Sequence, residues 1–412
     1  HDALPIFPWQ PGARHGAGCS EETTELAIVI FKKLDGAIYD MWNERKIQIQ
    51  AYYYEEPDTI WCISWEDAYL YKLNLQEGVL EEVVPLLENP DIQHTFNDIL
   101  PYKDGFIFIP AFYDSVLILN RQNWTYKKVS IPYKNPKIGT SDFKFFTGVV
   151  HKDYVYMFGY SYPGIVRISL KDMSINIIDG WLKSGDLRFS EVDGCFHVQY
   201  YRNGDLVYFP FMNTNAVMEF DLTTEKTTIH MVGEATMRYI SIEWNNGSFW
   251  LIPRDGSTGS IVKWNPLSGD TMYYRDYPEG FNYDKYAFYR SVDIGTKILL
   301  FAHRANMNIS IDVLTGEMSK YDDIYDSSCL SKAKYPHTEL QDGKIFFVNE
   351  KRCIWWDYVS EEKKCMAYDY GKKIQYRWKR EQLNKYFVVQ RGMPVRENEK
   401  FDLNSLIEYL QL

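Results

Sequence analysis

The sequence contains no run of roughly 18 apolar residues, so it predicts no membrane-spanning helix. Its six cysteines are scattered and none forms a C-x-x-C pair, which argues against a structural zinc site. The scattered cysteines predict reduced thiols and a cytoplasmic location, although Cys353 and Cys365 flank a predicted turn and could instead face each other. The chain also lacks the common serine-hydrolase, zinc-protease, P-loop and dinucleotide-binding motifs, and we predict no metal and no cofactor.

Positive charge is in the minority, because 45 Lys and Arg residues stand against 56 Asp and Glu residues, for a formal net charge of −11. Nucleic-acid phosphates and anionic lipids both attract a surface rich in Lys and Arg, so neither is an expected partner. The sequence is nevertheless 45% hydrophobic and 17% aromatic, which is ample for a folded core.

One motif recurs seven times along the chain. Each copy has an apolar strand, a short irregular stretch, and a second strand that ends in a polar residue before a turn. An Asn or Asp side chain at that point accepts hydrogen bonds from backbone amides two residues further on, which starts a tight turn. The polar residues that close the second strand lie 44 to 52 residues apart and are Asn74, Asn120, Ser169, Asp221, Asn265, Asp312 and Asp357.

The apolar segments of these repeats are only four to six residues long and rich in Val, Ile, Phe, Tyr and Trp, which favours strands over helices. A period of about 40 to 50 residues with four short strands is typical of propeller blades. We therefore predict an all-β fold, a seven-bladed β-propeller of four-stranded antiparallel blades that covers residues 45–375.

The two ends of the chain differ from the repeats. Residues 1–19 show no periodicity, and His1 to Ile6 read HDALPI, the string that the end of a common sequencing adapter encodes, so we expect a non-native or disordered segment. Helical spacing of apolar residues predicts a helix within 20–44. The extension 376–412 is expected to end in a short amphipathic helix that Asp402 caps.

Strand-and-turn strings such as FDLTTEK, WNPLSGD and IDVLTGE resemble bacterial propellers with kelch-like, quinoprotein-like or TolB-like repeats. The strings FIFIPAF and FWLIPRD, with FDLNSLIEYL at the end, look like uncharacterised propeller proteins of gut Firmicutes. The kelch glycine doublet is missing, and the Trp-Asp dipeptide of WD repeats occurs only at Trp356 and Asp357. The resemblance implies a fold and carries no catalytic residue with it.

Basic and aromatic residues occur together where the innermost strand of several blades should begin. Cations and ring faces that converge at one mouth of the central channel would bind an anion or a sugar. The alternative is that strand alternation places the rings between blades and leaves the basic groups in solvent. The candidate ligand-binding residues are His94, Lys144, His197, Arg238, Tyr239, Tyr289, Arg290 and His337.

Two functions of different kinds follow from these features. The first is a non-enzymatic propeller that binds a small-molecule anion, a glycan or a protein partner, since the recognisable motifs all serve the architecture. The second is a carbohydrate-active hydrolase or lyase with its site at the central channel. Among 56 acidic residues the sequence does not select a catalytic pair.

Overall fold

The computed structural model describes residues 47–134, 137–183, 187, 194–254, 259–283, 286–321, 338–341, 344–348, 352–357, 360, 362–375 and 377–378. Its strands all belong to one compact unit, Lys46–Ile374. The segment 1–19, the helix predicted within 20–44 and the helix predicted from Asp402 lie outside the described residues.

The first four blades each contain four consecutive strands. Blade 1 comprises β1 (Ile49–Glu55), β2 (Thr59–Ser64), β3 (Tyr69–Asn74) and β4 (Val79–Pro85). Blade 2 comprises β5 (Phe96–Tyr102), β6 (Gly105–Pro110), β7 (Ser115–Asn120) and β8 (Thr125–Ser130). Blade 3 comprises β9 (Phe145–His151), β10 (Tyr154–Gly159), β11 (Ile165–Ser169) and β12 (Ile175–Ile178), followed by the 3-10 helix η1 (Gly180–Lys183). Blade 4 comprises β13 (Tyr201–Asn203), β14 (Leu206–Pro210), β15 (Ala216–Asp221) and β16 (Thr227–Met231).

The last three blades repeat the same antiparallel order. Blade 5 comprises β17 (Tyr239–Asn245), β18 (Ser248–Pro253), β19 (Ile261–Trp264) and β20 (Thr271–Tyr274). Blade 6 comprises β21 (Phe288–Asp293), β22 (Lys297–Ala302), β23 (Asn308–Asp312) and β24 (Met318–Tyr321). Blade 7 comprises β25 (Thr338–Gln341), β26 (Lys344–Val348), β27 (Arg352–Asp357) and β28 (Glu362–Ala367), and a two-residue strand, β29 (Asp369–Tyr370), follows it.

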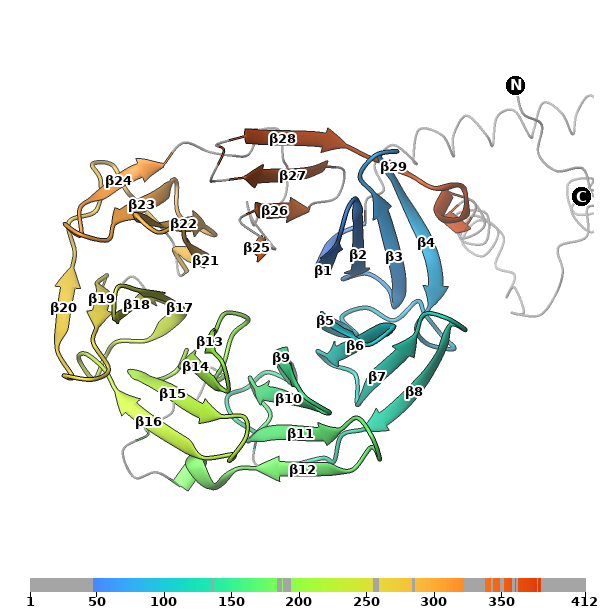
Figure 1. The fold of residues 1–412 in the computed structure, drawn as a ribbon, viewed down its shortest axis with the longest axis horizontal. Helices are drawn as coiled ribbons and strands as arrows, with labels where there is room; N and C mark the ends of the chain where they lie inside the picture. The colour runs from blue at the N-terminus through green and yellow to red at the C-terminus, as the bar shows by residue number, and fades with distance from the viewer. Residues whose placement is uncertain are drawn as a thin grey trace, which may run out of the picture. The chain divides into compact units, whose positions relative to one another are not determined.

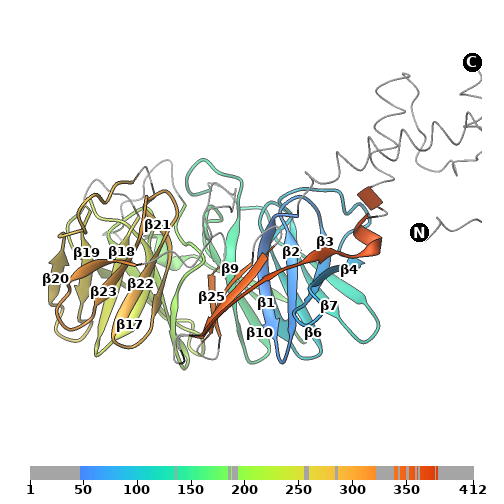
Figure 2. The ribbon, with the colours of Figure 1, turned by 90° about the horizontal axis from the view of Figure 1, so that it is seen from above.

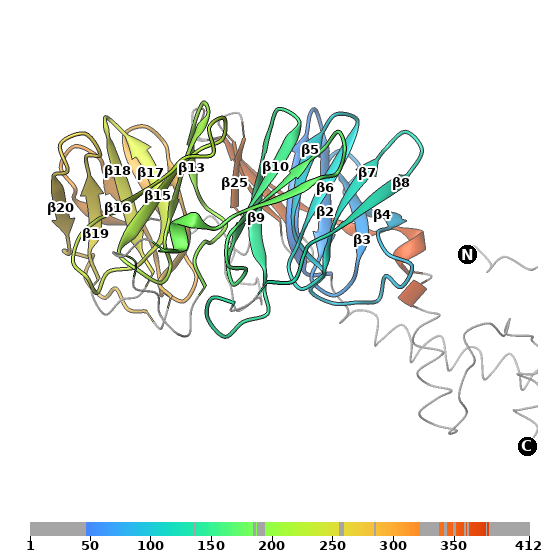
Figure 3. The same cartoon turned by 90° about the horizontal axis from the view of Figure 1, so that it is seen from below.

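Within this unit the seven sheets form a ring, with the first strand of each blade nearest the centre and the fourth at the rim (Figure 1). Seen from the two sides, the strands run roughly along the axis of the ring (Figure 2 and Figure 3). The seven-bladed propeller predicted from the repeats is therefore confirmed. The apolar interior is not one core but a series of clusters, each of which joins two consecutive blades. A blade that is apolar on both faces requires this radial stacking.

The predicted turn chemistry is present at the end of the third strands. The side-chain oxygen of Asn74 accepts hydrogen bonds from the backbone N–H groups of Gln76, at 2.9 Å, and Glu77, at 3.1 Å. Side-chain oxygens accept backbone N–H groups two or three residues further on at the six other repeats, namely at Asn120, Ser169, Asp221, Asn265, Asp312 and Asp357. These local bonds explain why the repeat is visible in the sequence.

The ring is closed by a strand that the sequence did not predict. β29 pairs in parallel with β4, so that Asp369 lies opposite Val79 and Tyr370 opposite Leu80. The backbone N–H of Ile47 also donates to the Tyr370 hydroxyl at 3.0 Å. This pairing fastens the end of the propeller to the outer edge of its first blade. A strand of two residues is too short to show a periodicity in the sequence, so it could not be predicted.

The cysteines of the described residues are all free thiols. Cys353 pairs with Met366 and Cys365 with Ile354, so the two residues are diagonal neighbours rather than direct partners. Cys62, Cys195 and Cys353 are buried and Cys365 is exposed, and burial raises the pKa of the three buried thiols. These three thiols are therefore protonated and unreactive at neutral pH.

Candidate functional site in the axial pocket

A β-bulge begins the innermost strand in five blades. In β1, β5, β9, β17 and β21 the strand has one residue more than its partner near its start. The residue before each bulge is here called the entry residue. In blade 4, Phe196 takes this place, because it forms an isolated β-bridge with Phe211. All the entry residues are at most 2% exposed. The entry residues are Ile49, Phe96, Phe145, Phe196, Tyr239 and Phe288.

The residue after each entry residue, here called the bulge residue, is the extra one, and it shifts the following side chains by one position. The bulge residues and their counterpart in blade 4 are Gln50, Asn97, Phe146, His197, Ile240 and Tyr289. Asn97 is the one of these six residues that lines the axial pocket, and the other lining residues come after the bulge positions. No alternation counted from the strand start would predict them.

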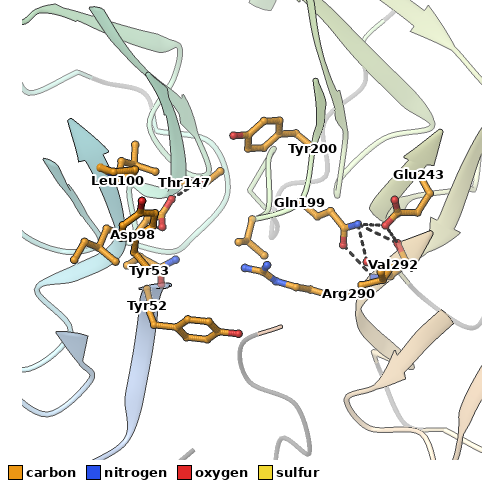
Figure 4. A pocket seen from close by; sticks show the side chains of 16 residues that line it. Tyr52, Tyr53, Asp98, Leu100, Thr147, Gln199, Tyr200, Glu243, Arg290 and Val292 are labelled. Atoms are coloured by element: carbon orange, nitrogen blue, oxygen red, sulfur yellow. Dashed lines mark hydrogen bonds between the residues drawn. The ribbon is translucent and has the colours of Figure 1, made fainter. Parts of the chain in front are cut away.

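A pocket of about 470 Å³ lies on the axis, between the innermost strands of six blades. Its apolar wall comes from residues such as Leu100 and Val292, and Tyr52 and Tyr200 contribute aromatic rings (Figure 4). The hydrogen-bonding side chains that line it are Asn97, Asp98, Thr147, Gln199, Glu243, Arg290 and Ser291.

Asp98 forms one side of the polar lining. Its carboxylate accepts a hydrogen bond from the Thr147 hydroxyl at 2.6 Å and another from the backbone N–H of Ile99 at 2.9 Å. Burial raises the pKa of Asp98, and the hydrogen bond from Thr147 and the positive charge of Arg290 partly oppose that rise. The guanidinium of Arg290 extends into the space between the two walls, toward the side on which Asp98 lies (Figure 4).

Glu243 lies on the opposite side of the pocket, in a network that joins three blades (Figure 4). The amide nitrogen of Gln199 donates to the Glu243 carboxylate and, at 3.0 Å, to the backbone carbonyl of Ser291. The Ser291 hydroxyl donates to Glu243 at 2.9 Å, and the Ser291 N–H donates to the Gln199 side-chain oxygen at 3.0 Å. Burial raises the pKa of Glu243 to about 7, and the neighbouring charge of Asp293 adds to the rise.

The structure places three of the eight sequence-predicted residues beside the axis. Arg290 lines the pocket. His197 and Tyr289 stand at bulge positions, and their ring centroids are 4.9 Å apart. The ring of His197 also lies 4.4 Å from that of Phe146.

The other predicted residues lie in different surroundings. His94 packs against Trp65 at a centroid distance of 3.8 Å, and the Lys144 ammonium donates to the carbonyl of Phe112 at 2.6 Å. Arg238 does not line the pocket, and its carbonyl accepts the backbone N–H of Arg254 at 2.9 Å. Tyr239 is an entry residue with 0% exposure, and its hydroxyl donates to the Val232 carbonyl, so it belongs to the core rather than to a ligand surface. His337 lies outside the described residues.

Sequence reasoning missed the pocket's two carboxylates and most of its other hydrogen-bonding groups, because it selected basic and aromatic pairs. The available signal was the presence of polar residues among the apolar ones of an inner strand, as with Asn97 and Asp98 in the string FNDIL and Ser241 and Glu243 in YISIEWN. A polar group at such a position needs a partner, and in this fold the partner comes from another blade.

Two other kinds of site are absent from the residues that the structure describes. No three His, Cys, Asp or Glu side chains come together there in a way that could hold a metal ion. No helix within the described ranges has the length and apolarity needed to cross a bilayer.

No protein-family model matches the chain, and no curated protein matches its sequence. Among solved structures, virginiamycin B lyase from Staphylococcus aureus resembles it with a TM-score of 0.53 and 12% identity, over 74% of this chain and 93% of that one. A catalytically inactive form of that lyase with Quinupristin gives a TM-score of 0.51 and 10% identity, over 79% and 97% of the two chains. The extracellular domain of BT4673 from B. thetaiotaomicron gives 0.52 and 10%, over 74% of this chain and 38% of that one. At such identities the likeness establishes the propeller fold alone.

Proposed function

We propose that this protein is a ligand-binding propeller that holds a small polar molecule in its axial pocket. The observation that carries the proposal is a cavity of about 470 Å³ in which Arg290 extends between two carboxyl groups on opposite walls. Pockets of roughly 300 to 1,000 Å³ with a few fixed polar groups in an apolar wall are the usual form of small-molecule sites.

The polar groups of the pocket are held in place before any ligand arrives. Thr147 and the backbone of Ile99 fix the Asp98 carboxylate, and Gln199 fixes Glu243 against blade 6. Such preorganisation lowers the entropy cost of binding. Arg290 supplies only donors and an ionised Asp98 only acceptors, so the matching ligand both donates and accepts hydrogen bonds.

The first prediction concerns Arg290. We expect Arg290→Ala to weaken by at least about tenfold the affinity for a molecule that binds the wild-type pocket, since hydrogen bonds to charged groups contribute roughly 1.5–3 kcal/mol. The ligand would be found by a thermal-shift screen of sugars, sugar acids, amino acids and their amides, and the affinities measured by isothermal titration calorimetry. The matched control is Arg275→Ala, because the Arg275 side chain is 57% exposed on an outer strand loop and contacts Glu234.

The expected pattern is that Arg290→Ala and Asp98→Asn both lose affinity while Arg275→Ala keeps it. Unchanged melting temperatures of the unliganded variants would show that the loss is not one of folding. If Arg290→Ala bound the molecule as tightly as wild type, the axial pocket would not be the binding site.

A second candidate function, a carbohydrate-active hydrolase or lyase, rests on Glu243. A carboxyl whose pKa is about 7 is suited to act as a general acid or base near neutral pH. Such chemistry on a bound sugar also commonly uses a second carboxyl, and Asp98 is available on the opposite wall.

The second prediction separates catalysis from binding. If the pocket is catalytic, incubating the protein with a bound sugar yields a product detectable by mass spectrometry, and Glu243→Gln lowers the rate by about 100-fold or more while binding persists. A sugar recovered intact after prolonged incubation, or a rate unaffected by Glu243→Gln, would leave binding as the function of this pocket.

A further inference from the structure

A continuous series of ring contacts includes Phe146, His197 and Tyr289, which directly precede residues that line the axial pocket. It runs from Trp65, which follows β2, through five blades to His303, which follows β22. Successive ring centroids lie 3.8 to 5.8 Å apart. The members of this ring arc, in order of contact, are Trp65, His94, Phe112, Phe143, Phe146, His197, Tyr289 and His303.

The ring arc differs from the aromatic packing between blades. The large interblade rings, such as Trp250, Tyr71 and Phe158, are less than 2% exposed. In the ring arc Phe112 is 42% exposed, and only Phe143 and His197 are fully buried. Partly exposed rings in continuous contact contribute less to the core than buried ones would, and they leave ring surface accessible to a ligand.

Two imidazoles of the ring arc carry no charge at neutral pH. Burial lowers the pKa of both His94 and His303, so these two imidazoles are neutral at pH 7. The nearby Lys144 ammonium donates to the carbonyl of Phe112. Uncharged rings of this kind favour contact with an apolar face of a ligand.

The ring arc and the axial pocket are contiguous. Phe146, His197 and Tyr289 immediately precede Thr147, Val198 and Arg290, which line the pocket. Asn97, which also lines the pocket, donates from its side chain to the Phe146 carbonyl at 2.6 Å. A ligand longer than the pocket would therefore pass directly onto the rings.

We propose that the ligand is an oligosaccharide, with one sugar unit in the axial pocket and the following units against the ring arc. This inference rests on the proposed binding function. A pyranose ring has hydroxyl groups that both donate and accept, as Asp98 and Arg290 require, and an apolar C–H face that stacks on neutral aromatic rings. A purely aromatic ligand would offer neither acceptors to the Arg290 guanidinium nor donors to the Asp98 carboxylate.

The test compares sugar chains of increasing length. An array of neutral mono- to hexasaccharides identifies the preferred series, and isothermal titration calorimetry then gives the affinity of each length. We expect the affinity to rise about tenfold or more from the monosaccharide to the tetrasaccharide, because each stacking contact adds a modest increment. Phe112→Ala should lower the tetrasaccharide affinity by about two- to tenfold and leave the monosaccharide affinity unchanged.

The matched control is Tyr126→Ala, since Tyr126 is 38% exposed in the same blade but lies on its outer strand, β8. The Lys144 bond is unaffected by Phe112→Ala because its acceptor is the backbone carbonyl. If the array showed no sugar binding while Arg290→Ala abolished the binding of another small molecule, the oligosaccharide assignment would fail and the proposed function would stand. If sugars bound in a way that depended on Phe112 but not on Arg290, the assignment of the axial pocket would fail instead.

Discussion

Replacing Phe196 by alanine is expected to destabilise the propeller by about 3–5 kcal/mol, as for other fully buried phenylalanines. Phe196 is 0% exposed and lies between blades 3 and 4. Its ring centroid is 4.7 Å from that of Phe211, 5.5 Å from that of Phe209 and 5.6 Å from that of Trp181. Because this cluster joins blades 3 and 4 and is not part of a core shared by the whole ring, the cavity cannot be filled from a common core. Urea unfolding followed by circular dichroism would measure the loss.

Phe112→Ala provides the control, because the same group of atoms is removed from a ring that is 42% exposed. That variant is expected to lose less than about 1 kcal/mol, in keeping with surface substitutions. An equal loss in the two variants would mean that the rings of the ring arc are packed as tightly as those between blades.

The fold could be predicted from the sequence because its signals are local. An Asn or Asp that closes a strand bonds amides two or three residues away, as Asn74 does with Gln76 and Glu77. The same short pattern therefore recurs in almost every blade and can be counted. β29 escaped prediction because its pairing with β4 joins residues nearly 300 positions apart and leaves only a dipeptide in the sequence.

The site could be predicted only in part, because the bulge shifts the alternation of side chains along the inner strand by one residue. Tyr239 and Tyr289 both stand beside an arginine at the start of an inner strand, and they look equivalent in the sequence. The register shows that Tyr239 is an entry residue and Tyr289 a bulge residue. A shift of one position sends a strand's side chain to the other face. Tyr239 therefore lies in the core, and Tyr289 contacts His197 beside the axis.

The carboxylates could not be chosen from the sequence for a different reason. What distinguishes Glu243 from the other acidic residues is its set of partners, Gln199 and Ser291, which are 92 residues apart in the chain. These contacts join blades 4, 5 and 6 and exist only once the ring has closed. No local sequence pattern predicts these contacts, whereas each turn is predicted by residues that are close together in the sequence.

Wild type is expected to lose unfolding free energy as the pH rises from about 4.5 to about 7. We expect Glu243→Gln to make this loss smaller. Burial raises the pKa of Glu243 from 4.5 to about 7, so in this range the folded protein keeps a proton that the unfolded chain releases. The stabilisation is complete below pH 4.5 and is lost as the pH rises through 7. It amounts to about 3 kcal/mol, since a tenfold change in a binding constant corresponds to about 1.4 kcal/mol.

The quantity to measure is the slope of the unfolding free energy against pH, obtained by urea unfolding at several values between pH 4.5 and 8. The amide of Glu243→Gln keeps an oxygen for Gln199 and Ser291, but its NH₂ group can meet the backbone N–H of Asp293, which donates to the carboxylate. That mismatch lowers stability by the same amount at every pH and cancels from the slope. Parallel curves for wild type and Glu243→Gln would show that folding does not raise the pKa of Glu243.

Glu66 supplies the matched control, because burial also raises its pKa to about 7 and it lies in blade 1 outside the pocket lining. Glu66→Gln should reduce the slope of the unfolding free energy against pH by a similar amount. The double variant should show the sum of the two reductions, since the two groups share no partner. Of these two glutamates only Glu243 lines the axial pocket, so only Glu243→Gln should change how the affinity for a ligand in that pocket depends on pH. If Glu66→Gln altered that dependence equally, the effect would come from the stability of the ring as a whole, and Glu243 would have no direct part in binding.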